Sequence, residues 1–305
     1  MKLPSRIPFM AIRNLAFAIT VVISIIGLGS LFKHGLNFGL DFTGGTLIEL
    51  SYEQPADLEL IKRELGQAGY TDAVVQSFGS TTDVLVRLAG DSADLGNEVA
   101  TALHKIDTTS FEVKRVEFVG PQVGEELRDQ GGLAMLLALG GILLYLAFRF
   151  QWKFGIGAVG SLAHDIIVTL GILAFFQVPF DLTVLAAVLA MIGYSLNDTI
   201  IIYDRIRENF RVLRKADIIE NIDVSVTQTL LRTMATSLST AMALIALLIF
   251  GGDSLGGFAL TLLIGVAVGT YSSIYISAPV LIWLKLTSED LIPPAVDPES
   301  IDERP

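Results

Sequence analysis

A carboxylate inside a long apolar stretch is the residue that points first to chemistry. Asp198 lies in the stretch 182–203, and the turn that follows it carries Ile200, Ile201 and Ile202. A charge at the centre of a membrane helix costs roughly 2.5 to 3.5 kcal/mol, so such a group indicates an ion or proton pathway. Asp198 sits about six residues from the end of its stretch, or roughly 9 Å at 1.5 Å per residue. We expect a coupling carboxylate, with a helix–helix hydrogen bond as the structural alternative.

A cation begins the next apolar stretch. Burial disfavours a carboxylate anion and a nearby cation favours it. Two conformations that bring Arg232 close to Asp198 or withdraw it would therefore release and bind a proton in turn. An arginine at a helix end also snorkels and anchors topology, which is the alternative for Arg232. Three neighbours, Asn197, Thr199 and Thr233, could complete a polar relay or pack between helices.

A second carboxylate lies deeper in another stretch. Asp165 is near the middle of 154–176, where a charge is most costly, and could be a second relay group. His164 beside it titrates near neutral pH when unperturbed. Adjacent helix residues point about 100° apart, so the two need not share a site. Buried polar contacts between helices are the alternative for both.

The composition shows what kind of protein must position these residues. Of 305 residues, 52% are hydrophobic and 17% are charged, which is too apolar for a soluble domain. The net charge of -11 comes mostly from a polar segment and the acidic tail, so nucleic-acid recognition is not indicated. Cysteine is absent, which excludes disulfides and thiolate metal sites. No HExxH, GxSxG or Walker motif occurs, so we expect a membrane protein that is not a hydrolytic enzyme.

Six apolar stretches are long enough to cross the membrane, which takes about 20 residues each. They are 15–32, 133–148, 154–176, 182–203, 233–250 and 258–284. The expected organisation is an N-terminus and first helix (1–32), an extracytoplasmic domain (33–130), helices two to six (131–284) and an acidic cytoplasmic tail (285–305).

Lysine and arginine in the short flanks set the orientation. They precede the first stretch and follow the second and fourth, whereas the links 177–181 and 251–255 carry none. Both termini are therefore expected in the cytoplasm. The first stretch could instead be a cleaved signal peptide, but no clear A-x-A site follows it and its removal would break the even number of crossings.

The polar segment between the first two stretches alternates between strand and helix patterns. We expect strands at 45–52, 72–78, 83–88 and 111–118, and helices at 56–68 and 93–106. This βαββαβ order is the ferredoxin-like unit, a fold that serves many unrelated roles. A helix-like piece, 124–130, leads into the second stretch. The pair Gly44 and Gly45 lacks a P-loop lysine, so a tight turn fixing the domain to the first helix is expected.

Glycine pairs and spacings within the apolar stretches indicate close helix approach. They are Gly131 with Gly132, Gly140 with Gly141, and Gly265 with Gly269.

Three strings together resemble the SecD/SecF family of protein-export membrane proteins, in the resistance-nodulation-division superfamily. They are GLDFTGGT at 39–46, GYSLNDT at 193–199 and YDRIREN at 203–209. The resemblance covers nearly the whole chain, and the Asn-Asp-Thr version favours the SecF branch. Its motif residues in the first string are Gly39, Asp41, Phe42, Gly44 and Gly45.

The resemblance implies a multi-pass subunit in the bacterial inner membrane that helps a translocating polypeptide leave the Sec translocase. It implies SecD and the SecYEG translocon as partners, with YajC and YidC as further candidates, and coupling to an H⁺ or Na⁺ gradient with no other cofactor. It also places the functional arginine in the stretch that begins at Arg232. A superfamily exporter of lipids or small molecules and a passive scaffold for SecD are the alternatives.

Overall fold

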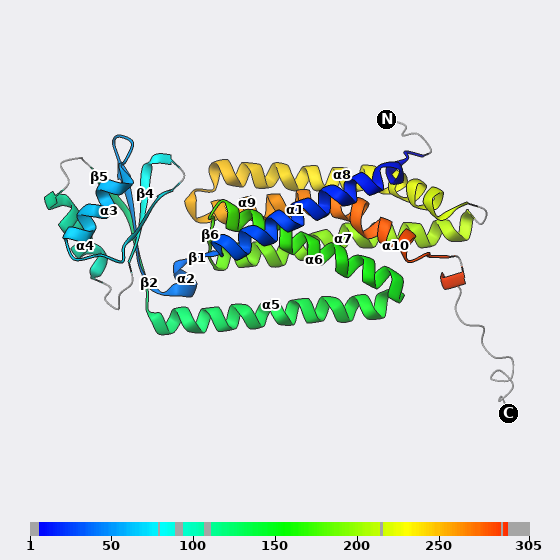
Figure 1. Ribbon diagram of the computed structural model, residues 1–305, viewed down its shortest axis with the longest axis horizontal. Coiled ribbons are helices and arrows are strands. Elements are labelled where there is room, and N and C mark those ends of the chain that lie inside the picture. Colours follow the sequence, from blue (N-terminus) through cyan, green and yellow to red (C-terminus); the bar gives the residue numbers. More distant parts are fainter. Residues whose placement is uncertain are drawn as a thin grey trace, which may run out of the picture.

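The protein is described by a computed structural model that covers residues 6–78, 80–88, 94–106, 111–213, 216–287 and 289–291. A bundle of long helices runs along the molecule, and a small α+β domain caps one end of it (Figure 1). We call this end of the bundle the domain end and the opposite one the far end.

Six helical segments of the described chain are long and apolar enough to cross a membrane, which confirms the expected number. They are Phe9–His34, Pro121–Arg149, Trp152–Phe175, Leu182–Val212, Ile218–Phe250 and Leu255–Trp283. The first combines a short 3-10 turn (Phe9–Ile12) with α1 (Arg13–His34), and the next four are α5, α6, α7 and α8. The last combines α9 (Asp253–Ser272), a π-helical turn (Ser273–Ser277) and α10 (Ala278–Trp283). Pro279 has no backbone N–H to donate, so the widened turn lies where a regular ladder would lose a bond.

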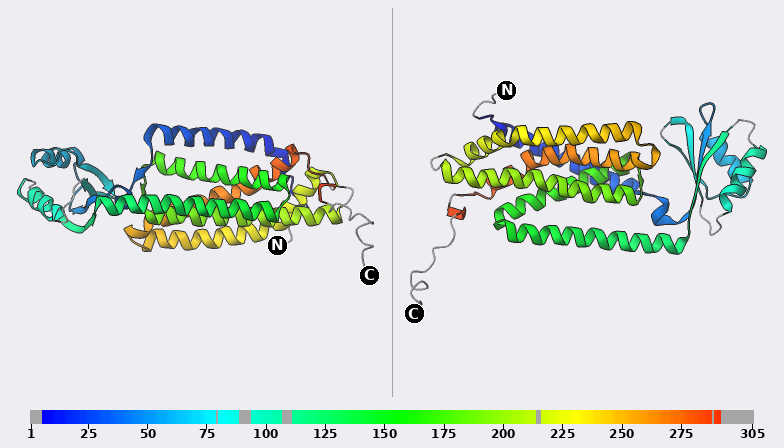
Figure 2. Two further views of the ribbon diagram at one scale, coloured as in Figure 1. Left: turned by 90° about the horizontal axis from the view of Figure 1, so that it is seen from below. Right: turned by 180° about the vertical axis from the view of Figure 1, so that it is seen from behind.

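Several helices extend beyond the predicted apolar stretches. Helix α7 continues to Val212 and α8 begins at Ile218, where the stretches ended at 203 and began at 233. These extensions mix charged residues with apolar ones, so a hydropathy window stops at their edge although the helix does not. Helix α5 begins at Pro121 and includes the helical piece predicted at 124–130. Figure 2 shows the α7 and α8 extensions together at the far end.

The domain has the predicted βαββαβ order. Its elements are β2 (Gly45–Tyr52), α3 (Leu58–Gln67), β3 (Val74–Phe78), β4 (Ser80–Leu88), α4 (Leu95–Ile106) and β5 (Phe111–Val119). The sheet order is β3-β4-β2-β5 with antiparallel neighbours. Strand β4 begins at Ser80, so the turn before it is shorter than predicted, and the predicted helix start at residue 93 lies outside the described residues.

Alternation along the strands gives the sheet two different faces. One face packs under α3 and α4, where Ile48, Leu50 and Val86 are completely buried. The other carries Leu47 and Leu85, which contact Leu40 of the short helix α2 (Leu40–Thr43). This second face therefore turns toward the helix bundle.

A second, two-stranded sheet joins the domain to the bundle. Strand β1 (Asn37–Phe38) follows α1 and pairs in parallel with β6 (Pro179–Phe180), which precedes α7. Nothing in the local sequence pattern predicts this pairing, because it joins segments far apart along the chain. It places the domain directly over the start of the helix that carries Asp198.

Candidate functional site

Asp198 is buried in the bundle without polar partners. Its exposed fraction is 0%, and neither carboxylate oxygen has a hydrogen-bond partner. The residue stands 14 positions before the end of α7 at Val212, about 21 Å along the helix axis. It is therefore deeper from the helix end than the roughly 9 Å predicted, because α7 continues past the apolar stretch.

Arg232, the cation predicted to act on Asp198, lies on α8, which packs against α7. No N–O distance of 4.0 Å or less joins the two side chains in the described chain, and Arg232 itself is exposed. Leaving a buried carboxylate unpaired is costly. A proton, a cation or a closer approach of Arg232 would each remove part of that cost, which is the property required of a coupling group.

Polar contacts tie α7 to neighbouring helices on both sides of this pair. Toward the domain end, the hydroxyl of Tyr194 donates to Ser237 over 3.4 Å, and Ser237 shares a 2.8 Å hydrogen bond with Thr270 of α9. Toward the far end, Gln228 of α8 accepts from Arg205 and Asn209 of α7 over 2.6 and 2.8 Å. Along α7, Asp198 therefore lies between two sets of interhelical polar contacts, one toward the domain end and one toward the far end.

The predicted relay residues make no hydrogen bond to the Asp198 carboxylate. Thr199 and Thr233 are both 2% exposed, and the Thr233 hydroxyl has no partner. Asn197 is exposed on α7. The structure therefore places a second unsatisfied polar atom on the helix that carries Arg232, one residue away from it.

Asp165 has a different environment from Asp198. It is also 0% exposed, yet its Oδ1 lies 3.0 Å from Nδ1 of His164, so the adjacent residues do share a site. Its Oδ2 accepts a short hydrogen bond from Ser195 of α7 and a 2.9 Å hydrogen bond from Ser272 of α9. Ser161 in turn donates to Ser272 over 2.9 Å.

The serines of this cluster were not predicted from the sequence. Small side chains at the α7–α9 contact allow them to meet, because a Cβ added at Gly269 would lie 2.7 Å from Cβ of Ser195. The spacing of Gly265 and Gly269 thus marks a close helix approach, as expected. A Cβ at Gly140 or Gly141 would meet no atom within 4 Å, so the prediction was wrong for that pair within this chain. Asking which hydroxyls lie at the depth of Asp165 on other spans would have found them.

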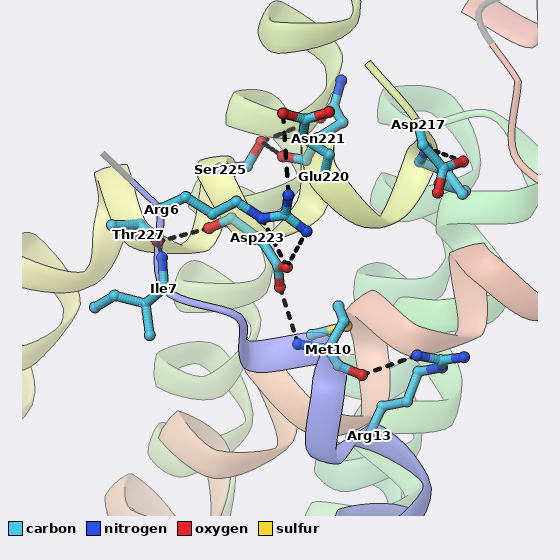
Figure 3. A network of polar contacts seen from close by, with 11 residues as sticks. Arg6, Ile7, Met10, Arg13, Asp217, Glu220, Asn221, Asp223, Ser225 and Thr227 are labelled. Carbon is cyan, nitrogen blue, oxygen red and sulfur yellow. Dashed lines mark hydrogen bonds and ion pairs between the residues drawn. The ribbon is translucent and has the colours of Figure 1, made fainter. Parts of the chain in front are cut away.

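The first described residues are held to α8 at the far end, as Figure 3 shows. Nε and Nη2 of Arg6 donate to Oδ2 of Asp223 over 3.2 and 3.0 Å. The backbone N–H of Met10 donates to Oδ1 of Asp223, and that of Ile7 to Thr227, both over 2.9 Å. From the sequence, Arg6 was expected only to help set the orientation, as one of the basic residues before the first stretch. No role was predicted for Asp223.

The family motif near Gly39 forms the junction between domain and bundle. The N–H of Gly39 donates to the carbonyl of Phe180 over 2.8 Å, and Oδ2 of Asp41 accepts from the N–H of Leu182 over 2.9 Å. Phe42 stacks on Phe180 with ring centroids 6.0 Å apart. The motif therefore fixes the domain to α7 as well as to the first helix.

The glycine pair makes the tight turn that the sequence predicted. Gly44 has φ +66° and Gly45 has φ +107°, a backbone conformation that glycine adopts without strain. A Cβ at Gly44 would lie 2.9 Å from Cα of Pro121, so the turn also sits against the start of α5.

No cluster of three or more His, Asp or Glu side chains that could hold a metal ion occurs in the described ranges.

Comparison with known proteins agrees with this architecture. Residues 98–287 match the family profile "Protein export membrane protein SecD/SecF, C-terminal", and residues 29–56 match the "SecD/SecF GG Motif". The chain is 66% identical over 300 residues to "Protein translocase subunit SecF" of Pseudomonas aeruginosa, covering 98% of both chains. It is 47% identical over 313 residues to the SecF subunit of Vibrio alginolyticus, covering 100% of this chain and 99% of that one.

Solved structures match as well. A SecDF structure from Thermus thermophilus, described as translocon-associated, has a TM-score of 0.84 at 37% identity over 92% of this chain. SecDF in a "Super-membrane-facing form" has a TM-score of 0.68 at 38% identity over 93%. This chain spans only 39% and 40% of those two solved chains. From the profile matches and the full-length relatives, the chain belongs to the SecD/SecF family of protein-export membrane proteins.

Proposed function

We propose that this chain acts with SecD to use the transmembrane ion gradient at Asp198 and Arg232, and so promotes polypeptide movement through the SecYEG translocon. The observation that carries the proposal is the fully buried, unpartnered carboxylate of Asp198 on α7, which packs against the helix that carries Arg232. Entry of H⁺ or Na⁺ neutralises the carboxylate, and its departure draws Arg232 closer.

Helix α7 links this site to the domain. The same helix that carries Asp198 begins at Leu182, whose N–H is held by Asp41 of the junction. Strand β6 immediately before it pairs with β1. A rotation or shift of α7 relative to α8 therefore moves the junction and, with it, the domain.

The energy that one ion supplies and the energy of one contact at the junction are of the same order. One charge crossing the membrane potential supplies roughly 2.3 kcal/mol per 100 mV. A hydrogen bond at the junction contributes about 1 kcal/mol. One ion step can therefore exchange one or two such contacts. The two SecDF structures support a mobile family fold, since nearly equal identity to this chain gives TM-scores of 0.84 and 0.68.

The proposed setting is the bacterial inner membrane with both termini in the cytoplasm. Lys153, Arg149 and Arg205 lie at the far end, and the links at the domain end carry no lysine or arginine, which favours a cytoplasmic far end. The domain is then extracytoplasmic, where it meets the emerging polypeptide. Because the matched SecDF chains are more than twice as long as this one, we propose that a separate SecD supplies the remainder, with YajC and YidC as further partners.

The first experiment replaces Asp198 with asparagine, which keeps the volume and removes the charge and its titration. We expect export of a secreted reporter to fall about tenfold in cells that depend on the variant, because asparagine cannot take up and release an ion and the coupling is lost. Membrane abundance and co-purification with SecD are measured in parallel. Glu125→Gln, which neutralises an exposed carboxylate on α5, is the matched control.

The result separates a motor from a scaffold. Lost export with normal abundance and SecD association supports ion coupling. Unimpaired export by Asp198→Asn would remove this carboxylate from the mechanism and leave the scaffold hypothesis. Imposing a pH or Na⁺ gradient separately across membrane vesicles then identifies the ion.

A further inference from the structure

A groove of about 660 Å³ lies between the α+β domain and the bundle. Its roof is the second face of the sheet, including Leu85 and Arg87, and its floor is formed by the domain ends of α8 and α9, including Leu248 and Gly256. Asp41 and Asp181 of the junction line one side. Figure 2 shows the sheet standing over the turn that joins α8 to α9.

Arg87 is a cation without a counter-ion in this groove. Its Nη1 donates to the carbonyl of Phe38 over 2.6 Å, its Nε is buried without a partner, and no carboxylate lies within 4.0 Å in the described chain. Burial lowers the pKa of its guanidinium, which reflects the cost of removing this charge from water. Arg115 in the same wall is instead paired with Glu117 at 3.1 Å. Arg87 therefore has donor capacity that the protein leaves unused.

Two carboxylates on the adjoining wall have unused acceptor capacity. Oδ2 of Asp41 accepts from the N–H of Leu182, and Oδ1 of Asp181 accepts from the N–H of Val184 over 2.8 Å. The second oxygen of each has no hydrogen bond in the part of the chain that the structure describes. The wall thus offers one site for an anion and two for a cation, which fits a ligand that carries both charges.

The floor places this charged wall at the membrane surface. Leu248 lies in the last turn of the α8 span, and Gly256 lies at the start of the last span. An apolar floor beneath a charged wall suits an amphiphile whose head is polar and whose tail enters the bilayer. An extended peptide is less well matched, because the sheet presents its face to the groove and strand addition needs a free edge.

We propose that this groove binds the headgroup of a phospholipid that carries a phosphate and a primary ammonium. The lipid comes from the leaflet on the domain side. Its phosphate accepts from Arg87, its ammonium donates to Asp41 and Asp181, and its first methylene groups lie on Leu248. The bound lipid holds the sheet over the span ends and does not depend on ion coupling at Asp198.

Lipid retention by the full chain purified with SecD tests the proposal. The complex in nanodiscs is exchanged against phosphatidylethanolamine, phosphatidylcholine or phosphatidylglycerol, and retained lipid is counted by native mass spectrometry. Phosphatidylethanolamine should be retained about tenfold more tightly than phosphatidylcholine, whose quaternary ammonium has no N–H to donate. It should also exceed phosphatidylglycerol, which lacks the ammonium.

Two variants change the roof and the floor of the groove separately. Arg87→Gln removes the phosphate contact, and we expect about a tenfold loss of retention, as for one charge-assisted hydrogen bond. Gly256→Leu fills the floor, because a Cβ there meets no atom within 4 Å and strains no backbone. The matched controls are Arg63→Gln on exposed α3 and Gly29→Leu on α1, where a Cβ also meets open space.

Each contrary result would overturn the proposal. Equal retention of the three lipids, or equal retention by variants and controls, would identify ordinary surrounding lipid. Loss in Arg87→Gln but not in Gly256→Leu would mean that Arg87 only braces the junction through Phe38. A photo-crosslinker at Leu85 that captures a translocating polypeptide and no lipid would assign the groove to the exported chain.

Discussion

Asp165 and Asp198 are both fully buried carboxylates in the bundle, but the protein treats them in opposite ways. Asp165 accepts from two serine hydroxyls and contacts His164, so its partners come from α6, α7 and α9. Asp198 has no such partners. A satisfied buried network rigidifies its surroundings, whereas an unsatisfied group favours change. We infer that Asp165 holds α6, α7 and α9 together as one block, so that Asp198 of α7 works against α8.

Removing one donor from the Asp165 cluster should therefore cost stability. In Ser272→Ala the carboxylate loses a 2.9 Å hydrogen bond and Ser161 loses its acceptor. We expect the free energy of unfolding to fall by about 1 to 3 kcal/mol, the cost of leaving buried polar groups unsatisfied. Thermal unfolding of the purified chain measures it. Ser239→Ala is the control, since this exposed hydroxyl bonds only within α8, and an equal effect of the two would show that Ser272 does not hold the cluster.

At the scale of single residues, charged side chains inside apolar stretches could be identified from the sequence. Asp198, Arg232 and Asp165 stand out because a charge inside an apolar stretch has few explanations. Ser195 and Ser272 do not, because serines are common in membrane helices and their partner depends on which helices are neighbours. Asp223 was missed for a related reason: an acidic residue near a helix start has many ordinary roles.

At the scale of elements, the turn between the domain and α5 depends on backbone conformation. Gly44→Ala places a Cβ on a residue with φ +66° and 2.9 Å from Cα of Pro121. With ψ at 179°, this backbone conformation is essentially restricted to glycine and costs roughly 1 to 3 kcal/mol in a residue with a side chain, and the contact adds to it. We expect faster hydrogen exchange in α2 and at the start of α5, with the sheet core of the domain still protected.

The control for this turn is a glycine that needs no special conformation. Gly66→Ala on α3 meets no atom within 4 Å, and helix propensity makes it neutral or stabilising by up to about 1 kcal/mol. If Gly44→Ala leaves exchange at the junction as slow as in Gly66→Ala, the turn does not fix the domain.

Elements were predictable where one local signal decides them. The sequence pattern of the domain predicted β2 with its observed bounds and β5 within a residue. The length of each apolar stretch predicted the six spans. It did not predict the extensions of α7 and α8, which are stabilised by contacts such as that of Asn209 with Gln228. The pairing of β1 with β6 has no local signal at all.

At the scale of the whole molecule, α8 has little apolar support. Only 17% of the most hydrophobic window in its span is buried within the chain. Its far-end extension is instead held by polar contacts with α7. The segment that precedes α1 adds further polar contacts (Figure 3). Because α8 is one continuous helix from Ile218 to Phe250, these contacts also position Arg232, nine residues after Asp223.

Exchanging the charges of Arg6 and Asp223 tests whether that attachment acts through the helix. Arg6 is 41% exposed, so solvent screens its side of the pair and Arg6→Asp should cost about 1 kcal/mol. Asp223 is 1% exposed at its side chain, so Asp223→Arg should cost about 3 kcal/mol. Arg6→Asp leaves two carboxylates facing each other, and Asp223→Arg also removes the acceptor of the Met10 N–H. The double variant restores attraction without that acceptor, so its stability should recover in part.

Reporter export should follow the same order, because Arg232 is displaced with the helix. Strictly additive losses in both unfolding and export would show that the two residues do not act as a pair. Recovery of stability without recovery of export would confine the attachment to folding and separate it from the position of Arg232.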